Sequence, residues 1–187
     1  MPETGARRRS GEVIADTIEK GRPMRMCWVV AALSFALPIP PLFAAELPAT
    51  IDVPNVTVVA TFHAEGVQLY ECGIEAGRKM WRFREPIASL IADGITIGRH
   101  YSGPTWEHTD GSLVRAKAVG SAPGATPDDI PWLRLDVASQ VGNGALRAVT
   151  SVQRINTRGG VAAGSCDEAG SFRGVPYAAD YVFLRKD

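Results

Sequence analysis

The stretch Trp-Leu-Arg-Leu-Asp-Val-Ala, at residues 132–138, has the clearest alternation of side-chain type in the chain. Leucine or valine occupies every second position from residue 133 to residue 137, with one arginine and one aspartate between them. Successive side chains of a β-strand point to opposite faces, so this two-residue period predicts a strand with one buried and one solvated face. The fold is built outward from this strand.

Strand patterns continue along the rest of the chain, separated by clusters of Gly, Pro and Asp. They predict strands at residues 56–63, 67–72, 80–84, 95–101, 145–156 and 177–185, and Asp110-Gly111 predicts a hairpin that supplies two more. No segment has a convincing helical period. The sequence therefore predicts an all-β single domain, a β-sandwich or partly closed barrel of about nine short strands with little helix.

Residues 24–45 have the pattern of a secretory signal peptide. Arg25 precedes an uncharged run of about a dozen residues, and the small pair Ala44-Ala45 follows a group of prolines. This run is shorter than the roughly 20 residues that span a bilayer, so we expect cleavage near Ala45 and no transmembrane segment in the mature chain. We expect translation to start at Met24, with residues 1–23 a non-native extension, and residues 46–187 to form one β-rich domain.

The charges of residues 46–187 are nearly balanced. They include 14 Lys and Arg against 16 Asp and Glu, a net charge of −2. A basic excess is the electrostatic signature of nucleic-acid binding, and its absence argues against a nucleic-acid partner.

The cysteines predict a disulfide. Cys27 lies in the signal peptide, which leaves Cys72 and Cys166 as an even pair in an exported domain. Closing a loop of nearly 100 residues stabilises a fold by up to about 4.7 kcal/mol on the chain-entropy model. A metal-binding or nucleophilic thiol is the alternative, but no Cys-x-x-Cys or Cys/His spacing favours it. The pair indicates a periplasmic or extracellular location.

The block at residues 100–112 is the best candidate for a functional site, because it concentrates histidine, tyrosine, tryptophan and acidic side chains. A two-residue loop at Asp110-Gly111 would place Glu107 opposite Val114 and Trp106 opposite Arg115. This register buries Glu107 on the more apolar face and exposes Trp106 beside cations. A loop one residue longer or shorter reverses both faces, burying Trp106 and leaving Glu107 in water.

The first register favours chemistry. Burial on an apolar face raises the pKa of a carboxyl group, so Glu107, with His100 or Asp110, could act as a general acid or base. An exposed tryptophan near charged groups can stack on a sugar ring or a cation. The candidate ligand-binding residues in this block are Tyr101, Trp106, His108 and Arg115.

Arg154 and Asn156 lie in a polar run near the end of a long strand, where such residues can line a pocket. Asp180, in the otherwise apolar last strand, is a candidate partner for Arg154 in a buried ion pair. His100 and His108 match no metal-ligand spacing, so we expect neither a metal nor a cofactor.

Five blocks together resemble a known family. They are GVQLYEC (66–72), HYSGPTWEHTDGS (100–112), IPWLRL (130–135), VQRINTRGG (152–160) and YAADYVF (177–183). This set and its order resemble the domain-of-unknown-function family numbered 3455, found in exported bacterial and fungal proteins. The resemblance implies no established activity. Some relatives carry a dehydrogenase label, but the run at 142–144 lacks the third glycine of a dinucleotide-binding loop.

Two hypotheses for function follow from the sequence. The first is a non-catalytic ligand-binding or envelope-associated module that takes a small molecule or a polysaccharide. The alternative is an acid-base hydrolase, acting on glycans or esters and centred on Glu107.

Overall fold

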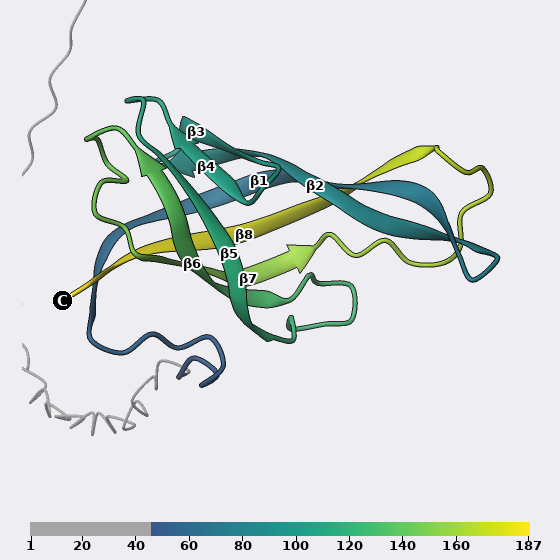
Figure 1. The fold of residues 1–187 in the computed structure, drawn as a ribbon, viewed down its shortest axis with the longest axis horizontal. Coiled ribbons are helices and arrows are strands. Elements are labelled where there is room, and N and C mark those ends of the chain that lie inside the picture. Colours follow the sequence, from purple (N-terminus) through teal and green to yellow (C-terminus); the bar gives the residue numbers. More distant parts are fainter. Residues whose placement is uncertain (1–45) are drawn as a thin grey trace, which may run out of the picture. The chain divides into compact units, whose positions relative to one another are not determined.

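The computed structural model describes residues 46–187, which form eight strands and no helix (Figure 1). The signal peptide and the extension expected at residues 1–45 lie outside the described residues. The strands are β1 (Val56–Glu75), β2 (Arg78–Ala92), β3 (Ile95–Tyr101), β4 (Thr105–His108), β5 (Leu113–Ala122), β6 (Trp132–Val141), β7 (Ser151–Gly159) and β8 (Phe172–Lys186).

The strands form one antiparallel sheet that closes into a barrel. Each strand pairs with the next along the chain, and β1 pairs with β8 to complete the ring. Closure satisfies the backbone groups of what would otherwise be two edge strands. The all-β prediction is confirmed, with a closed barrel in place of a partly closed one. The structure has eight strands where about nine were expected, and three of them are longer than expected, with 15 or more residues.

Gly66 explains one error in the strand count. The sequence pattern places a break before residue 67, but β1 runs through Gly66 without interruption. A Cβ atom at Gly66 would lie 2.1 Å from the carbonyl oxygen of Ile87 and 2.6 Å from the Cα atom of Ala88. The glycine permits close approach of β1 and β2 in mid-strand, and it does not mark a turn.

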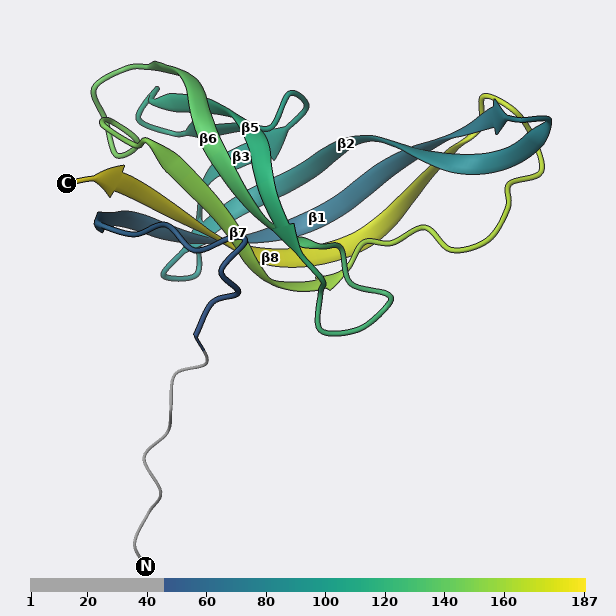
Figure 2. The ribbon, with the colours of Figure 1, turned by 60° about the horizontal axis from the view of Figure 1, so that its bottom comes forward.

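Three strands extend beyond the barrel. β2 pairs with β3 only from Ala88 onward, and β8 pairs with β7 only from Tyr177 onward. Residues 67–87 of β1 and β2 and residues 172–176 of β8 therefore form a separate projection, which we call the arm (Figures 1 and 2). The loop at 160–171 runs from the end of β7 along the arm to the start of β8.

A disulfide ties this loop to the arm. Cys72 of β1 bonds to Cys166 of the loop, with their Cα atoms 5.8 Å apart, so the predicted pairing is confirmed. The hydroxyl of Tyr70 also donates a hydrogen bond to the carbonyl of Gly160, at 2.7 Å. Both contacts hold the loop along the arm.

The barrel interior is the core. Its buried aromatic side chains are Phe62, Trp106, Tyr177, Tyr181 and Phe183, packed with aliphatic residues that include Leu90, Val114, Leu135 and Val152. Tyr181 and Phe183 are buried on one face of β8 and Leu184 on the other, as expected for a strand covered on both sides.

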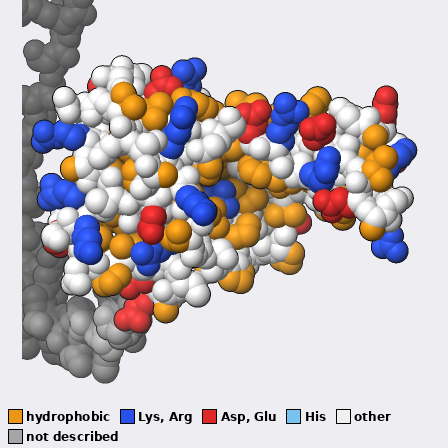
Figure 3. Space-filling model, in the orientation of Figure 1, with side chains coloured by type: hydrophobic (Ala, Val, Ile, Leu, Met, Phe, Trp, Pro, Cys, Tyr) orange, Lys and Arg blue, Asp and Glu red, His pale blue; other side chains and the backbone are white. Residues whose placement is uncertain are grey.

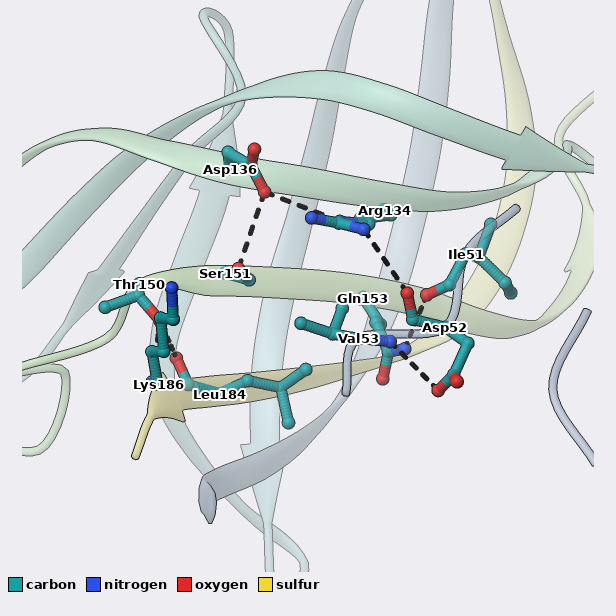
Figure 4. A network of polar contacts seen from close by, with 10 residues as sticks. All are labelled: Ile51, Asp52, Val53, Arg134, Asp136, Thr150, Ser151, Gln153, Leu184 and Lys186. Atoms are coloured by element: carbon teal, nitrogen blue, oxygen red, sulfur yellow. Dashed lines mark hydrogen bonds and ion pairs between the residues drawn. The ribbon is translucent and has the colours of Figure 1, made fainter. Parts of the chain in front are cut away.

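The segment before β1 packs against the outside of the barrel (Figure 4). Ile51 is buried, and its carbonyl accepts a hydrogen bond from the Gln153 side chain at 2.7 Å. Arg134 donates to the carbonyl of Asp52 and lies 3.5 Å from Asp136. These contacts cover the outward face of β6 and β7, leaving the inward face of both strands to the core. Residues 46–187 contain no helix able to cross a membrane.

Candidate functional site

The hairpin of β4 and β5 has the alternative register. Trp106 lies opposite Val114 and Glu107 opposite Leu113, so the register expected for a two-residue loop is wrong. The loop has three residues between His108 and Ser112, whose backbones are joined by a 2.9 Å hydrogen bond. Gly111 has a φ of 86°, the left-handed position that three-residue hairpin loops require. The extra residue turns Trp106 into the barrel.

Glu107 consequently lies on the outer face of the barrel. Its carboxylate accepts hydrogen bonds from the hydroxyl of Tyr101 and from the guanidinium of Arg99, each at 2.9 Å. These two donors hold the pKa of Glu107 below its usual value. The physical reason for expecting an acid-base role, a carboxyl group buried on an apolar face, does not hold here.

Asp110 shapes the hairpin loop. Its carboxylate accepts hydrogen bonds from the backbone N–H and the hydroxyl of Ser112 and from the backbone N–H of Ala145. These bonds hold the pKa of Asp110 well below its usual value. Nδ1 of His108 lies 3.1 Å from the Asp110 carboxylate. The arrangement fixes the loop against the segment that precedes β7.

His100 of β3 is enclosed inside the barrel, with 3% of its surface exposed. Its ring stacks on Trp106 with centroids 4.5 Å apart, and Nδ1 lies 2.8 Å from the carbonyl oxygen of Thr105. A carbonyl only accepts, so Nδ1 carries the proton and Nε2 keeps its lone pair. Burial lowers the pKa of His100 to about 3, despite the opposing effect of the Thr105 hydrogen bond.

This low pKa predicts that the protein becomes less stable at mildly acidic pH. The unfolded chain binds a proton at His100 near pH 6.5, whereas the folded chain does not until about pH 3. The contribution of His100 to the free energy of unfolding is therefore complete above pH 6.5. It is lost as the pH falls toward 3, by about 2 kcal/mol between pH 7 and pH 5. Urea unfolding at both pH values measures the loss. His100→Gln should remove most of this pH dependence, and an unchanged dependence in that variant would contradict the assignment.

A cavity of about 440 Å³ opens where the arm leaves the barrel. Its wall is largely apolar and aromatic, with side chains from β1, β2, β5 and β6 and from the turn at residues 103–104. Figure 3 shows apolar side chains gathered between the barrel and the arm, with basic groups among them. The polar and aromatic side chains that line the cavity are Gln68, Tyr70, Arg84, His100, Trp106, Arg154 and Tyr181.

Two buried hydrogen-bond donors on this wall have no partner among residues 46–187. They are Nε2 of Gln68 and Nε1 of Trp106, on side chains that are 2% and 1% exposed. Buried polar groups in folded proteins are nearly always paired, and an unpaired donor costs about 1–3 kcal/mol. Three further unpaired buried donors lie elsewhere in the described residues, on Trp81, Trp132 and Arg134, so this feature is not confined to the cavity.

Arg154 reaches the cavity from β7. Its Nε and one terminal nitrogen donate to the carbonyl of Pro131, at 3.1 and 2.8 Å. The expected ion pair with Asp180 is wrong, because the Asp180 carboxylate accepts from Asn156 and lies 2.8 Å from Nδ1 of His63 on the outer surface. Adjacent strand positions point to opposite faces, and the register puts Asp180 outside and Tyr181 inside.

The candidate residues thus separate into two groups. His100, Trp106 and Arg154 converge on the cavity, whereas the other six lie elsewhere. Those six are Tyr101, Glu107, His108, Asp110, Arg115 and Asn156. The sequence reasoning missed Gln68, Tyr70 and Tyr181. A glutamine between Val67 and Leu69 was the one available signal.

The family resemblance is confirmed. A family model described as "Protein of unknown function (DUF3455)" matches residues 53–185, which span all of β1 to β7 and nearly all of β8. No curated protein and no solved structure matches the chain.

Proposed function

Because the chain belongs to the DUF3455 family of proteins of unknown function, no activity comes with the family, and we propose a function from the cavity. The domain is a non-catalytic binding module, and its ligand is a small molecule that occupies the mouth of the barrel. The observation that carries this proposal is the cavity of about 440 Å³ at the mouth of the barrel, with its largely apolar and aromatic wall.

The shape and chemistry of the cavity support a small molecule over a polysaccharide. A volume of about 440 Å³ lies within the range of small-ligand sites, which combine apolar walls with a few fixed polar groups. Leu133, Leu135 and Ile130 supply apolar wall, and the stacked rings of His100 and Trp106 supply a rigid aromatic surface. A polymer needs an open groove, and this site is a recess.

A binding role also fits better than acid-base hydrolysis. His100 lines the cavity, and its low pKa keeps it neutral at physiological pH, so it has no proton to give at Nε2 and is only a weak proton acceptor there. The cavity wall carries no Asp or Glu within residues 46–187. The hydrolase hypothesis centred on Glu107 has no support from this geometry, because Glu107 lies outside the barrel.

The location we propose is outside the cytoplasm, in the periplasm or the extracellular space. The disulfide supports an oxidising compartment, since cytosolic thiols are kept reduced. Counting free thiols in protein isolated from its own cells tests the location. A reduced Cys72 and Cys166 would contradict it.

The cavity proposal predicts that an apolar dye binds and that filling the cavity abolishes binding. The neutral dye N-phenyl-naphthylamine should fluoresce when added to the purified protein, with one site per chain. Ala118 lines the cavity, and Ala118→Trp should weaken binding about tenfold or more by occupying the same volume. Fluorescence titration measures both affinities.

Val119 gives the matched control. It is the next residue of β5, it is 52% exposed, and it does not line the cavity. Val119→Trp should bind the dye as the unmodified protein does. Equal affinity in both tryptophan variants, or no binding to the unmodified protein, would contradict the proposed function.

A further inference from the structure

One of the two positive charges on the cavity wall has no neighbouring acid among the described residues. Two arginines line it, Arg84 and Arg154. Arg84 is paired on the arm, 3.1 Å from the Glu71 carboxylate and 3.8 Å from that of Glu85. Arg154 lies within 4.0 Å of no carboxylate in the described part of the chain. Its charge is therefore balanced by nothing on the wall.

The surroundings of Arg154 fix its position and leave its charge uncompensated. The Pro131 carbonyl accepts two of its hydrogen bonds, but a carbonyl is a neutral group that supplies only a partial negative charge. The guanidinium is partly buried, and charges removed from water are normally paired. A guanidinium held in one orientation is a ready partner for a carboxylate, which it can meet with two parallel hydrogen bonds.

The other polar groups at the site select the same kind of ligand. The side chains of Gln68 and Trp106 line the cavity with Arg154, and all three carry N–H donors and no negative charge. His100 is neutral and adds no charge. Tyr70 and Tyr181 complete the polar wall, and Arg154 acts electrostatically on both, since it opposes the rise in pKa that burial causes at each hydroxyl.

We propose that the ligand is a small organic acid, with an aromatic or apolar body between the cavity walls and one anionic group on the Arg154 guanidinium. This inference rests on the proposed function and narrows it to one chemical class. The apolar wall and the aromatic stack of His100 on Trp106 receive the body of the molecule. The unpaired cation of Arg154 receives its acid group.

Two dyes that share a ring system and differ in charge test the inference. Anilinonaphthalene sulfonate carries one anionic group that neutral N-phenyl-naphthylamine lacks. The purified protein should bind the anionic dye about tenfold or more tightly than the neutral one, as a charge-assisted hydrogen bond predicts. Arg154→Gln should remove that preference, so that the two dyes bind the variant with nearly equal affinity. Arg154→Lys should keep part of the preference, because it keeps the charge.

Arg158 provides the control for net charge. It lies on the same strand, is exposed and does not line the cavity, so Arg158→Gln should retain the full preference for the anionic dye. Equal affinity for both dyes in the unmodified protein would overturn the acid-ligand inference and leave the cavity proposal standing. A preference that survives Arg154→Gln would overturn it as well. Failure to bind either dye would instead contradict the proposed function.

Discussion

Replacing Cys72 and Cys166 together by serine should lower the free energy of unfolding by about 4 kcal/mol. The two cysteines are 94 residues apart, so the bond restricts a large part of the unfolded chain, and the chain-entropy cost of closing such a loop grows with its length. In the folded protein the bond also holds the loop at 160–171 against the arm. Urea unfolding of the double variant and of the unmodified protein, both without reductant, gives the difference.

Reduction of the unmodified protein is the internal control. It should bring the stability of the unmodified protein close to that of the double variant, because both then lack the same cross-link. The barrel itself should survive in both, since the pairing of β1 with β8 does not depend on the disulfide. A difference below about 1 kcal/mol would mean that the cross-link does little to hold the fold.

Trp106→Ala should destabilise the protein by about 3–5 kcal/mol. Trp106 is buried, and its ring lies 4.5 Å from His100, 5.2 Å from Tyr181 and 6.0 Å from Phe183, measured between centroids. Truncation removes the largest side chain of the core and leaves a void that strands of a closed barrel cannot collapse to fill. Thermal and urea unfolding measure the loss.

The same substitution tests the hairpin register. In the register with a two-residue loop Trp106 would face solvent, and Trp106→Ala would then change stability by no more than about 0.5 kcal/mol. Trp106→Phe separates packing from hydrogen bonding, because it keeps an aromatic ring and removes the Nε1 donor. This variant should retain most of the stability, but its affinity for the anionic dye should be lower.

Strand type and the disulfide were predictable, because both depend on local or nearly unique features. Alternation at residues 132–138 identifies β6, and two cysteines allow one pairing. Gly66 was misread, since glycine at a turn and glycine at a close approach look alike in a sequence. The strand at residues 87–92 was missed because Ile87 is apolar and yet 51% exposed, which hides the two-residue period.

The site was only partly predictable, for a topological reason. A one-residue change in the loop after His108 decides whether Trp106 or Glu107 faces inward, and residue types near Asp110 do not fix that length. Tyr70 and Tyr181 come to one cavity because β1 and β8 meet when the ring closes. That closure is a property of the whole sheet and leaves no mark on either strand alone.

The most direct test of a ligand-binding cavity follows the indole N–H of Trp106 by nuclear magnetic resonance during titration with anilinonaphthalene sulfonate. Because the Trp106 side chain lies on the cavity wall, that signal should move in a saturable way as the dye binds. The indole signals of Trp81 and Trp132, which do not line the cavity, should move much less. Saturable binding of the dye with an unmoved Trp106 signal would place the ligand elsewhere and contradict the account.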